Sequence, residues 1–559
     1  MKTLTLLLLT LFVAATVFAQ PFNLPVQHII VVVQENRTID NLFANDPALV
    51  ANGVHIATTG QCGTQTITLA PYQLDACFDA SHAHTAWVTA YDSGKRDQFC
   101  SISSGIAGCT PQQQQGIPSC LVNGVQTPCP QYTTVNASQL GPYFQLAANG
   151  GFANYMFQTN QGPSFPAHQF LFAGSSEPIA PITKDYRFFA AENAKFPAGD
   201  TDKHYGCLAD VGTIVKQVNP TTGAEVNGYT PTYVASADQT PGYPCYEHNT
   251  LADVFNAVTP NPISWRYYTA GDGSLWNAPN AIYHICVPSG STTNGTSTCT
   301  GGVYTSNVIS NLQLFTDLGA NPSLPQWTLP QVSWVIPDGN WSDHPGNVGH
   351  DGGPSWVAAI VNAVGGFNND GTALPTSCGY WSNTVVITTW DDWGGYYEDV
   401  DPIAMSSGNG GKLGYPGTSN GTFYVYGFRV PLLVNSTFAK INYVSGANVY
   451  PPVCPNSYCH DYGSILNFIE YAFGTGGKSL PEVGYAGSNW HYADFYAQDK
   501  GTAPYALNDF FNFQTANPFV KITGSKYNTS CFLSKSAAKG CFPGFPKKPD
   551  NDEEQGDID

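Results

Sequence analysis

Residues 28–33 read His-Ile-Ile-Val-Val-Val, and Gln34-Glu35-Asn36-Arg37 follows directly. A short, continuous run of β-branched residues is typical of a strand that is buried in a parallel sheet. Two further runs have this character, namely residues 331–336 (Gln-Val-Ser-Trp-Val-Ile) and residues 384–389 (Thr-Val-Val-Ile-Thr-Thr). The sequence therefore predicts at least three central strands of one sheet.

Helical patterns follow the second and third of these strands. They cover residues 354–364 and residues 464–473. Strands that alternate with helices favour an α/β fold, in which a mostly parallel central sheet carries helices on both faces.

Each predicted strand runs into polar residues. Glu35-Asn36 follows the first strand, Asp391-Asp392 follows the strand at 384–389, and the strand at 331–336 leads to His344. In open α/β sheets the polar cleft lies at the carboxyl ends of the strands, so these residues predict a site there. Two adjacent carboxylates repel each other unless a cation or an arginine lies between them, although a solvated strand end is the alternative.

Three other blocks contain candidate functional groups. Ser164 follows a Gly-Pro turn where a helix can begin, so it is either an N-cap or a nucleophile at a helix N-terminus that favours phosphate. His82 and His284 lie in two further polar turns. A single histidine is more often structural, and these two shift the balance only modestly.

The charge of the chain restricts its partners. Asp and Glu number 40 against 21 Lys and Arg, for a formal net charge of −19. A nucleic-acid partner would require a basic face, so the composition argues against one. An anionic substrate would require a local reversal of sign, which a bound cation supplies most directly.

The N-terminus predicts the compartment. Residues 1–19 combine Lys2, an apolar run and the small-x-small pattern Val17-Phe18-Ala19, which indicates a signal peptide cleaved near Ala19; an uncleaved anchor is the alternative. We therefore expect a secreted or periplasmic protein without stable membrane insertion. A single catalytic domain is expected over residues 20–545, and a disordered acidic tail over residues 546–559.

Fifteen cysteines fit such a compartment, which favours disulfides. The odd number leaves at least one cysteine without a partner in the chain. Insertions stapled by disulfides are expected near residues 100–139 and 204–246. The cysteines that lie close enough together to pair locally are Cys62 and Cys77, the group Cys100, Cys109, Cys120 and Cys129, then Cys454 with Cys459, and Cys531 with Cys541.

Seven motif blocks follow one another along the chain. They are Gln34–Asp40, Asp79–His82 with Tyr91–Phe99, Gly162–Ser164, Ser342–Pro345, Trp390–Gly395, Gly427–Pro431 and Ser464–Glu470. In sequence and in order these blocks resemble those of the bacterial phosphoesterase family, which includes non-haemolytic and haemolytic phospholipases C and secreted acid phosphatases.

The resemblance implies an alkaline-phosphatase-like core and assigns roles to residues. It implies that one metal is bound by Glu35, Asn36, Ser164, Asp391 and Asp392. It also implies that Ser164 is the nucleophile and that histidines face the phosphoryl oxygens and the leaving group. These histidines are His82, His284 and His344. A carboxylate, amide and alkoxide ligand set suits a hard divalent ion such as Ca²⁺, Mg²⁺ or Mn²⁺.

Two blocks depart from the family pattern. Asp392 stands where the family usually has the longer Glu, which puts direct ligation there in doubt. Ala167-His168 replaces the Asn-Arg of many phospholipases C, and this form is closer to the acid phosphatases. Arg37 is expected to form a structural salt bridge at the edge of the site.

The implied function is a secreted, metal-dependent phosphoesterase that hydrolyses phosphate esters through a serine. Its substrate is either a phosphomonoester or a phosphodiester such as a phospholipid head group. A sulfatase-like hydrolase is one alternative, although the chain lacks the sulfatase signature that matures to formylglycine. A catalytically inactive extracellular binding protein on the same core is the other alternative.

Overall fold

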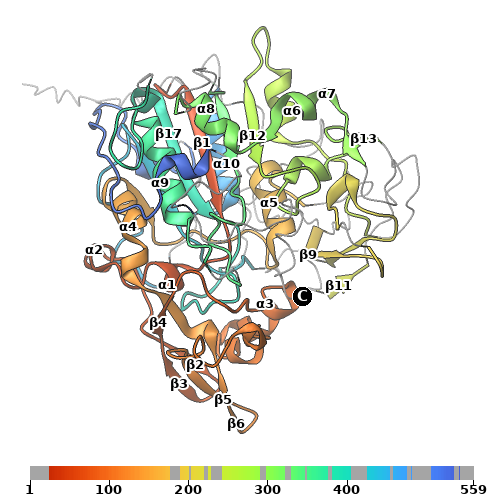
Figure 1. The fold of residues 1–559 in the computed structure, drawn as a ribbon, viewed down its shortest axis with the longest axis vertical. Helices are drawn as coiled ribbons and strands as arrows, with labels where there is room; N and C mark the ends of the chain where they lie inside the picture. Colours follow the sequence, from red (N-terminus) through yellow and green to blue (C-terminus); the bar gives the residue numbers. More distant parts are fainter. Residues whose placement is uncertain are drawn as a thin grey trace, which may run out of the picture.

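An eight-stranded sheet lies at the centre of the computed structural model, and β1 (His28–Gln34) is one of its inner strands (Figure 1). The strand order is β15-β12-β16-β1-β17-β18-β8-β19. β1 pairs in parallel with both neighbours, β16 (Val332–Val335) and β17 (Thr384–Trp390), as the sequence predicts. The remaining strands of the sheet are β8 (Gly151–Ala153), β12 (Trp265–Thr269), β15 (Val308–Ser310), β18 (Leu432–Ser436) and β19 (Tyr443–Ser445).

The structure describes most of the chain between residues 24 and 541. The described ranges are 24–176, 189–200, 203–219, 224–227, 242–289, 297–320, 329–346, 349–375, 380–403, 425–452, 458–474, 480, 505–533 and 541. The predicted signal peptide and acidic tail lie outside them. None of the helices within these ranges is long and apolar enough to span a membrane.

Helices cover both faces of the sheet. All residues of β16 and β17 are buried, and successive residues of a strand point to opposite faces, so neither face is open to solvent. On one face Trp334 packs against Phe172 of α5 (Ser164–Ala173), with ring centroids 5.1 Å apart. On the other face Trp390 packs against Tyr143 of α4 (Gly141–Ala148), with ring centroids 5.2 Å apart.

Helices begin where the sequence indicates. The two helical patterns correspond to α9 and α10, and Ser164 is the first residue of α5. The α-helices are α1 (Ile39–Leu42), α2 (Pro47–Ala51), α3 (His84–Tyr91), α4 (Gly141–Ala148), α5 (Ser164–Ala173), α6 (Leu251–Ala257), α7 (Gly302–Asn307), α8 (Leu312–Asp317), α9 (Gly353–Val364) and α10 (Tyr462–Ala472).

Small sheets lie outside the central one. Three of them, β2-β3, β4-β7 and β5-β6, form the lower part of the molecule in Figure 1, together with α3. A three-stranded sheet, β11-β10-β9, and the pair β13-β14 lie on the right of the view. Their strands are β2 (Thr59–Cys62), β3 (Gln65–Thr68), β4 (Ala70–Tyr72), β5 (Ser119–Val122), β6 (Val125–Pro128), β7 (Thr133–Val135), β9 (Phe189–Lys195), β10 (Ile214–Asn219), β11 (Ala224–Val226), β13 (Pro288–Ser289) and β14 (Thr298–Cys299).

Disulfides staple these outer segments. Cys531 pairs with Cys541 as predicted, whereas the predicted partner of Cys459, Cys454, lies outside the described residues. Cys62 and Cys77, which lie close enough in the chain to pair with each other, pair instead with Cys100 and Cys109, because the fold brings these more distant segments together. The other bridges between described residues are Cys62–Cys100, Cys77–Cys109, Cys120–Cys129, Cys207–Cys245 and Cys286–Cys299.

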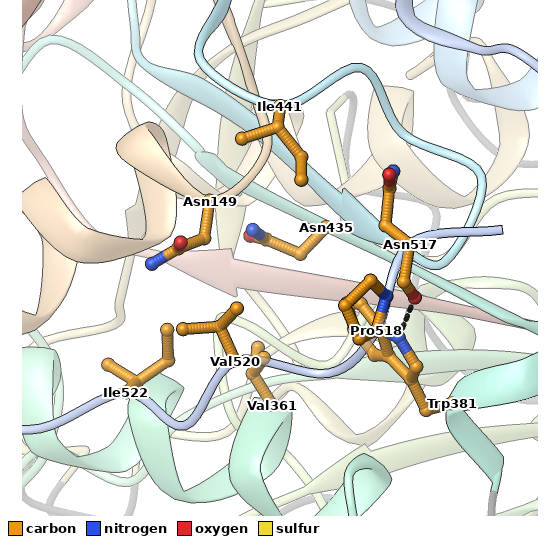
Figure 2. Close-up of a pocket in the computed structure, with 9 residues that line it drawn as sticks. All are labelled: Asn149, Val361, Trp381, Asn435, Ile441, Asn517, Pro518, Val520 and Ile522. Carbon is orange, nitrogen blue, oxygen red and sulfur yellow. Dashed lines mark hydrogen bonds between the residues drawn. The ribbon is translucent and has the colours of Figure 1, made fainter. Parts of the chain in front are cut away.

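The segment 505–533 packs across the sheet and α9. Figure 2 shows Pro518, Val520 and Ile522 of this segment beside Val361 of α9 and Asn435 of β18. Trp381 donates from its indole N–H to the backbone carbonyl of Asn517 (3.0 Å), which holds the segment in place. These residues enclose a cavity of about 10 Å³, which is room for a single water at most and excludes a ligand site here.

A fully buried arginine joins the segments around the sheet. Arg429 donates to Glu398 (Nε–Oε1, 2.7 Å) and lies 3.6 Å from Asp40, and none of the three side chains is exposed. It also donates to the backbone carbonyls of Asn154 (2.9 Å) and His55 (3.1 Å). Removing one member of a buried ion pair leaves an uncompensated buried charge, so this cluster is a point of structural sensitivity.

We therefore predict that Arg429→Met lowers the free energy of unfolding by about 3–5 kcal/mol, because Glu398 and Asp40 lose their counter-charge. Urea unfolding followed by tryptophan fluorescence measures the loss. Lys95→Met is the control, because Lys95 is 66% exposed in its pair with Asp92 and its removal should leave the unfolding midpoint nearly unchanged. Equal midpoints for the two variants would contradict this role for Arg429.

Candidate functional site

Two polar strand ends meet at one edge of the sheet. Gln34 and Trp390 are the last residues of β1 and β17 and are partners in the parallel register, so the residues after them lie side by side. The backbone N–H of Asn36 donates to Asp391 Oδ1 at 3.0 Å, and the backbone N–H of Asp392 donates to the same oxygen at 2.7 Å. All of these side chains are buried.

The backbone at this junction is tightly constrained. Asn36 has a left-handed conformation (φ 60°), which is uncommon for a residue with a side chain and is concentrated at functional sites. Gly394 also has a positive φ, and a Cβ on it would lie 2.1 Å from the carbonyl oxygen of Asn36. Glycine is thus required there for the two loops to approach each other.

Ser164 reaches the same junction from the N-terminus of α5. Its hydroxyl donates to Asp392 Oδ2 at 3.0 Å and lies 3.5 Å from Asn36 Oδ1. The N-cap of the helix is Pro163, and no side chain caps it, so the alternative role of Ser164 as an N-cap does not hold. A Cβ at Gly162 would lie 1.9 Å from the carbonyl oxygen of Ala191 in β9, which explains the glycine in this turn.

The N-terminus of α5 offers few backbone donors to a phosphate. The N–H of Phe165 donates to the side-chain oxygen of Asn193 (3.1 Å), and Pro166 has no N–H. The N–H of Ala167 bonds to the carbonyl of Pro163. An anion at this site would therefore meet side chains more than the free N–H groups of the helix N-terminus that the sequence suggested.

His82 belongs to the same cluster. Asn36 Nδ2 donates to His82 Nε2 at 3.0 Å, while His82 Nδ1 bonds to the carbonyl of Ala80 at 2.9 Å. Because Asn36 turns its oxygen to Ser164 and its amide nitrogen to His82, the geometry favours the neutral ring with the proton on Nδ1. His344 lies next to this ring, with centroids 6.1 Å apart, and its Nδ1 bonds to the carbonyl of Pro345.

His284 has a different environment. Its Nδ1 lies 2.6 Å from Glu247 Oε1, and its Nε2 lies 3.0 Å from Asp253 Oδ1. These two carboxylates raise the pKa of His284 to about 10, against the opposing effect of burial. Within the described part of the chain, the contacts of His284 are not with Ser164, Asn36 or Asp392.

The sequence analysis did not identify His168 as a functional residue, although it belongs to this cluster. His168 Nε2 lies 3.2 Å from Glu35 Oε1 and 3.7 Å from Asp391 Oδ2, and all three side chains are buried. Burial lowers the pKa of His168 to about 4, which favours the neutral imidazole. Its position four residues after Ser164 could have indicated it, because residues four apart in a helix lie on one face.

Arg37 and Asp343 form structural hydrogen bonds next to the site. Arg37 donates to the carbonyl of Asp343 (Nε–O, 2.9 Å), the carbonyl of Leu74 (2.7 Å) and the hydroxyl of Tyr396 (2.8 Å). It is structural as predicted, but its recorded partners are neutral groups and not the carboxylate of a salt bridge. Burial raises the pKa of Asp343 to about 6, although Arg37 lowers it. The Asp343 carboxylate accepts from Tyr143 (2.7 Å) and Trp390 (3.0 Å).

The arrangement of the cluster fits a cation. Glu35, His168 and Asp391 each present one ligand atom, and these atoms lie within 4.8 Å of one another. Asp391 Oδ2 is buried and accepts no hydrogen bond from any described residue. A buried carboxylate oxygen without a donor is costly unless a positive charge compensates it.

Comparisons with known proteins agree with the sequence blocks. Non-hemolytic phospholipase C of Pseudomonas aeruginosa is 22% identical to this chain over 480 residues, which cover 80% of this chain and 54% of that protein. Hemolytic phospholipase C of the same organism is 30% identical over 155 residues (26% of this chain, 18% of that protein). Phospholipase C B of Mycobacterium tuberculosis is 31% identical over 123 residues (20% of this chain, 21% of that protein).

The chain spans about half the length of the first of these relatives. The sequence profile of the phosphoesterase family matches residues 26–476, a range that includes the ends of β1 and β17, the start of α5, and α10. The chain therefore belongs to the phosphoesterase family.

Proposed function

We propose that this protein is a secreted, metal-dependent phosphoesterase that attacks phosphate esters with Ser164. The observation that carries the proposal is the buried Ser164 hydroxyl, 3.0 Å from Asp392 Oδ2 and beside Asn36. A serine is a weak nucleophile until a neighbouring base or a cation activates it, and Asp392 is such a base. The six disulfides between described residues support the oxidising compartment.

The protein's own residues can carry two proton transfers. As the Ser164 oxygen forms a bond to phosphorus, its proton passes to Asp392 Oδ2, which already accepts the hydroxyl hydrogen bond. The bond between phosphorus and the leaving oxygen breaks, and a protonated His344 supplies the proton to the departing alcohol, while His82, whose Nε2 accepts from Asn36, stays neutral and positions that amide. Water then hydrolyses the phosphoserine by the reverse transfers.

Glu35, Asn36 and Asp391, together with Ser164 and Asp392, would hold one divalent cation. When bound, such an ion lowers the pKa of the serine and offsets the charge that develops on the phosphoryl oxygens. Asp391 suits this purpose because its Oδ1 is held by two backbone N–H groups while its Oδ2 is directed at Glu35 and His168. The chemistry of the proposal does not use His284, because both of its ring nitrogens are bonded to carboxylates.

The proposed core is alkaline-phosphatase-like, with the site at the carboxyl ends of parallel strands. The proposed substrate is either a phosphomonoester or the head group of a phospholipid. The names of the relatives favour phospholipase C chemistry. The Phe165-Pro166-Ala167-His168 form after the nucleophile resembles the acid phosphatases instead.

Ser164→Ala should reduce turnover by several orders of magnitude, because the nucleophile and its activating groups act as one unit. The stability of the variant should change little, since Ser164 is not an N-cap. Acid-quenched mass spectrometry with a slow substrate should detect a phosphoryl group on the wild-type peptide that contains Ser164. Ser436→Ala is the control: this serine bonds to the carbonyl of Thr384, at the opposite end of β17. An active Ser164→Ala enzyme would refute the covalent route.

Exhaustive chelation should remove activity, and a divalent metal should restore it. Asp391→Ala should lose the ion, because Oδ2 is a ligand and Oδ1 positions Asn36. Elemental analysis of the purified variants measures metal content directly. Asp370→Ala is the matched control, since Asp370 lies outside the cluster and bonds to Thr372 and Asn528. Full metal content in Asp391→Ala would exclude Asp391 as a ligand.

A comparison of two chromogenic substrates should separate the two candidate activities. Faster turnover of p-nitrophenyl phosphate identifies a phosphomonoesterase, whereas faster turnover of p-nitrophenyl phosphorylcholine identifies a phospholipase C. We expect at least one of the two to be hydrolysed in a Ser164-dependent reaction, measured as the initial rate of nitrophenol release. Hydrolysis of neither substrate by metal-loaded enzyme would favour the inactive binding protein.

A further inference from the structure

The fold places His168 beside two carboxylates, a contact that the sequence around His168 does not indicate. It lies one helical turn after Ser164 on α5, and the whole helix is buried. Its Nε2 faces Glu35 Oε1 at 3.2 Å and Asp391 Oδ2 at 3.7 Å. Glu35 follows β1 and Asp391 follows β17, so three separate elements converge on one point.

The other nitrogen of His168 has a partner that fixes the tautomer. Its Nδ1 lies 3.4 Å from the hydroxyl of Tyr267 on β12. Tyr267 donates its single hydroxyl proton to the carbonyl of Trp276 (2.7 Å), so towards His168 it can only accept. Nδ1 therefore carries a proton, and Nε2 is the nitrogen directed at the carboxylates. A histidine oriented by such an outer hydrogen bond is the usual form of a metal-bound imidazole.

The distances between ligand atoms agree with metal coordination. Ligands that bind zinc tetrahedrally at about 2.0–2.1 Å lie roughly 3.3–3.4 Å apart. The two distances from Nε2, 3.2 and 3.7 Å, are close to this spacing.

Asp392 is directed elsewhere. Its Oδ2 accepts from Ser164 and its Oδ1 accepts from the backbone N–H of Gly394 (2.7 Å). The shorter side chain at this position thus serves the nucleophile, and His168 occupies the position next to Glu35 and Asp391. The two departures from the family pattern, Asp392 in place of Glu and Ala167-His168 in place of Asn-Arg, therefore fit together: Asp392 contacts the nucleophile, and His168 lies beside the other two carboxylates.

We propose that His168 is a nitrogen ligand of the catalytic ion, so that the site selects a divalent transition metal of the Mn²⁺-to-Zn²⁺ series over Ca²⁺ or Mg²⁺. Imidazole suits these metals, whereas Ca²⁺ and Mg²⁺ take oxygen ligands almost exclusively. This inference rests on the metal site of the proposed function; of the three ions that the sequence suggested, it retains Mn²⁺ and excludes Ca²⁺ and Mg²⁺. The competing explanation is a protonated His168 that bridges the two carboxylates in place of a metal.

The first measurement uses the wild-type protein. The full-length chain is stripped with a chelator and loaded with Co²⁺, and its X-ray absorption spectrum is recorded. We expect the outer-shell scattering of a coordinated imidazole. Competition titrations should show that Co²⁺ and Zn²⁺ bind more tightly than Ca²⁺. Binding of Ca²⁺ alone, or a Co²⁺ spectrum without imidazole scattering, would overturn the proposal.

The second measurement uses His168→Gln, which replaces the nitrogen with an amide oxygen. The ratio of Co²⁺ to Ca²⁺ affinity should fall by roughly 100-fold or more, since even outer-shell changes at metal sites cost about 10–100-fold. His28→Gln is the control, because His28 lies at the opposite end of β1 from Glu35 and bonds to the carbonyl of Pro330. An unchanged ratio in His168→Gln would overturn the proposal, and if this variant does not fold, the wild-type spectrum decides.

These measurements separate the two hypotheses. If His168 binds Co²⁺ but the loaded enzyme hydrolyses no phosphate ester, the ligand assignment stands and the proposed function fails. If Ser164-dependent hydrolysis is found with an ion that His168 does not bind, the proposed function stands and the ligand assignment fails.

Discussion

The parallel register of β1 and β17 is the constraint on which the site depends. Because Gln34 pairs with Trp390, the loops that carry Glu35 and Asn36 and those that carry Asp391 and Asp392 leave the sheet side by side. The apolar residues of both strands are fully buried, and their burial supplies the free energy that holds this register. A shift of one residue would turn every side chain of a strand to the other face and would separate the carboxylates.

Hydrogen bonds in which one of the two partners is neutral hold much of this junction together. Backbone N–H groups position Asp391, and Arg37 is bonded to backbone carbonyls behind the site. Phenol and indole groups hold Asp343 in the same way. None of the described residues donates a hydrogen bond to Asp391 Oδ2, so in the proposed site a cation compensates this carboxylate oxygen. The acidic chain as a whole would otherwise repel a phosphate ester.

Two adjacent residues, Asp391 and Asp392, have different surroundings and so different proposed roles. Asp391 points to Glu35 and His168, whereas Asp392 points to Ser164. In the proposed site Asp391 therefore serves the cation alone, whereas Asp392 also accepts the proton of the nucleophile. This division explains why a shorter carboxylate is compatible with the proposed mechanism, since Asp392 has only to reach the hydroxyl of a neighbouring helix.

The sequence by itself determined the central strands, α9, α10 and the polar residues at the strand ends, because burial and chain direction leave a local pattern in the chain. Motif blocks also indicated Ser164, His82 and His344; the structure brings Ser164 and His82 to Asn36 and places His344 beside His82. Only the tertiary structure decided that His168 joins Glu35 and Asp391, that His284 is held between Glu247 and Asp253, and which cysteines pair. These contacts join residues that lie far apart in the chain; Glu35 and His168, for example, are separated by 133 positions. Their geometry depends on how helices and loops pack on the sheet, and a local sequence pattern does not contain that information.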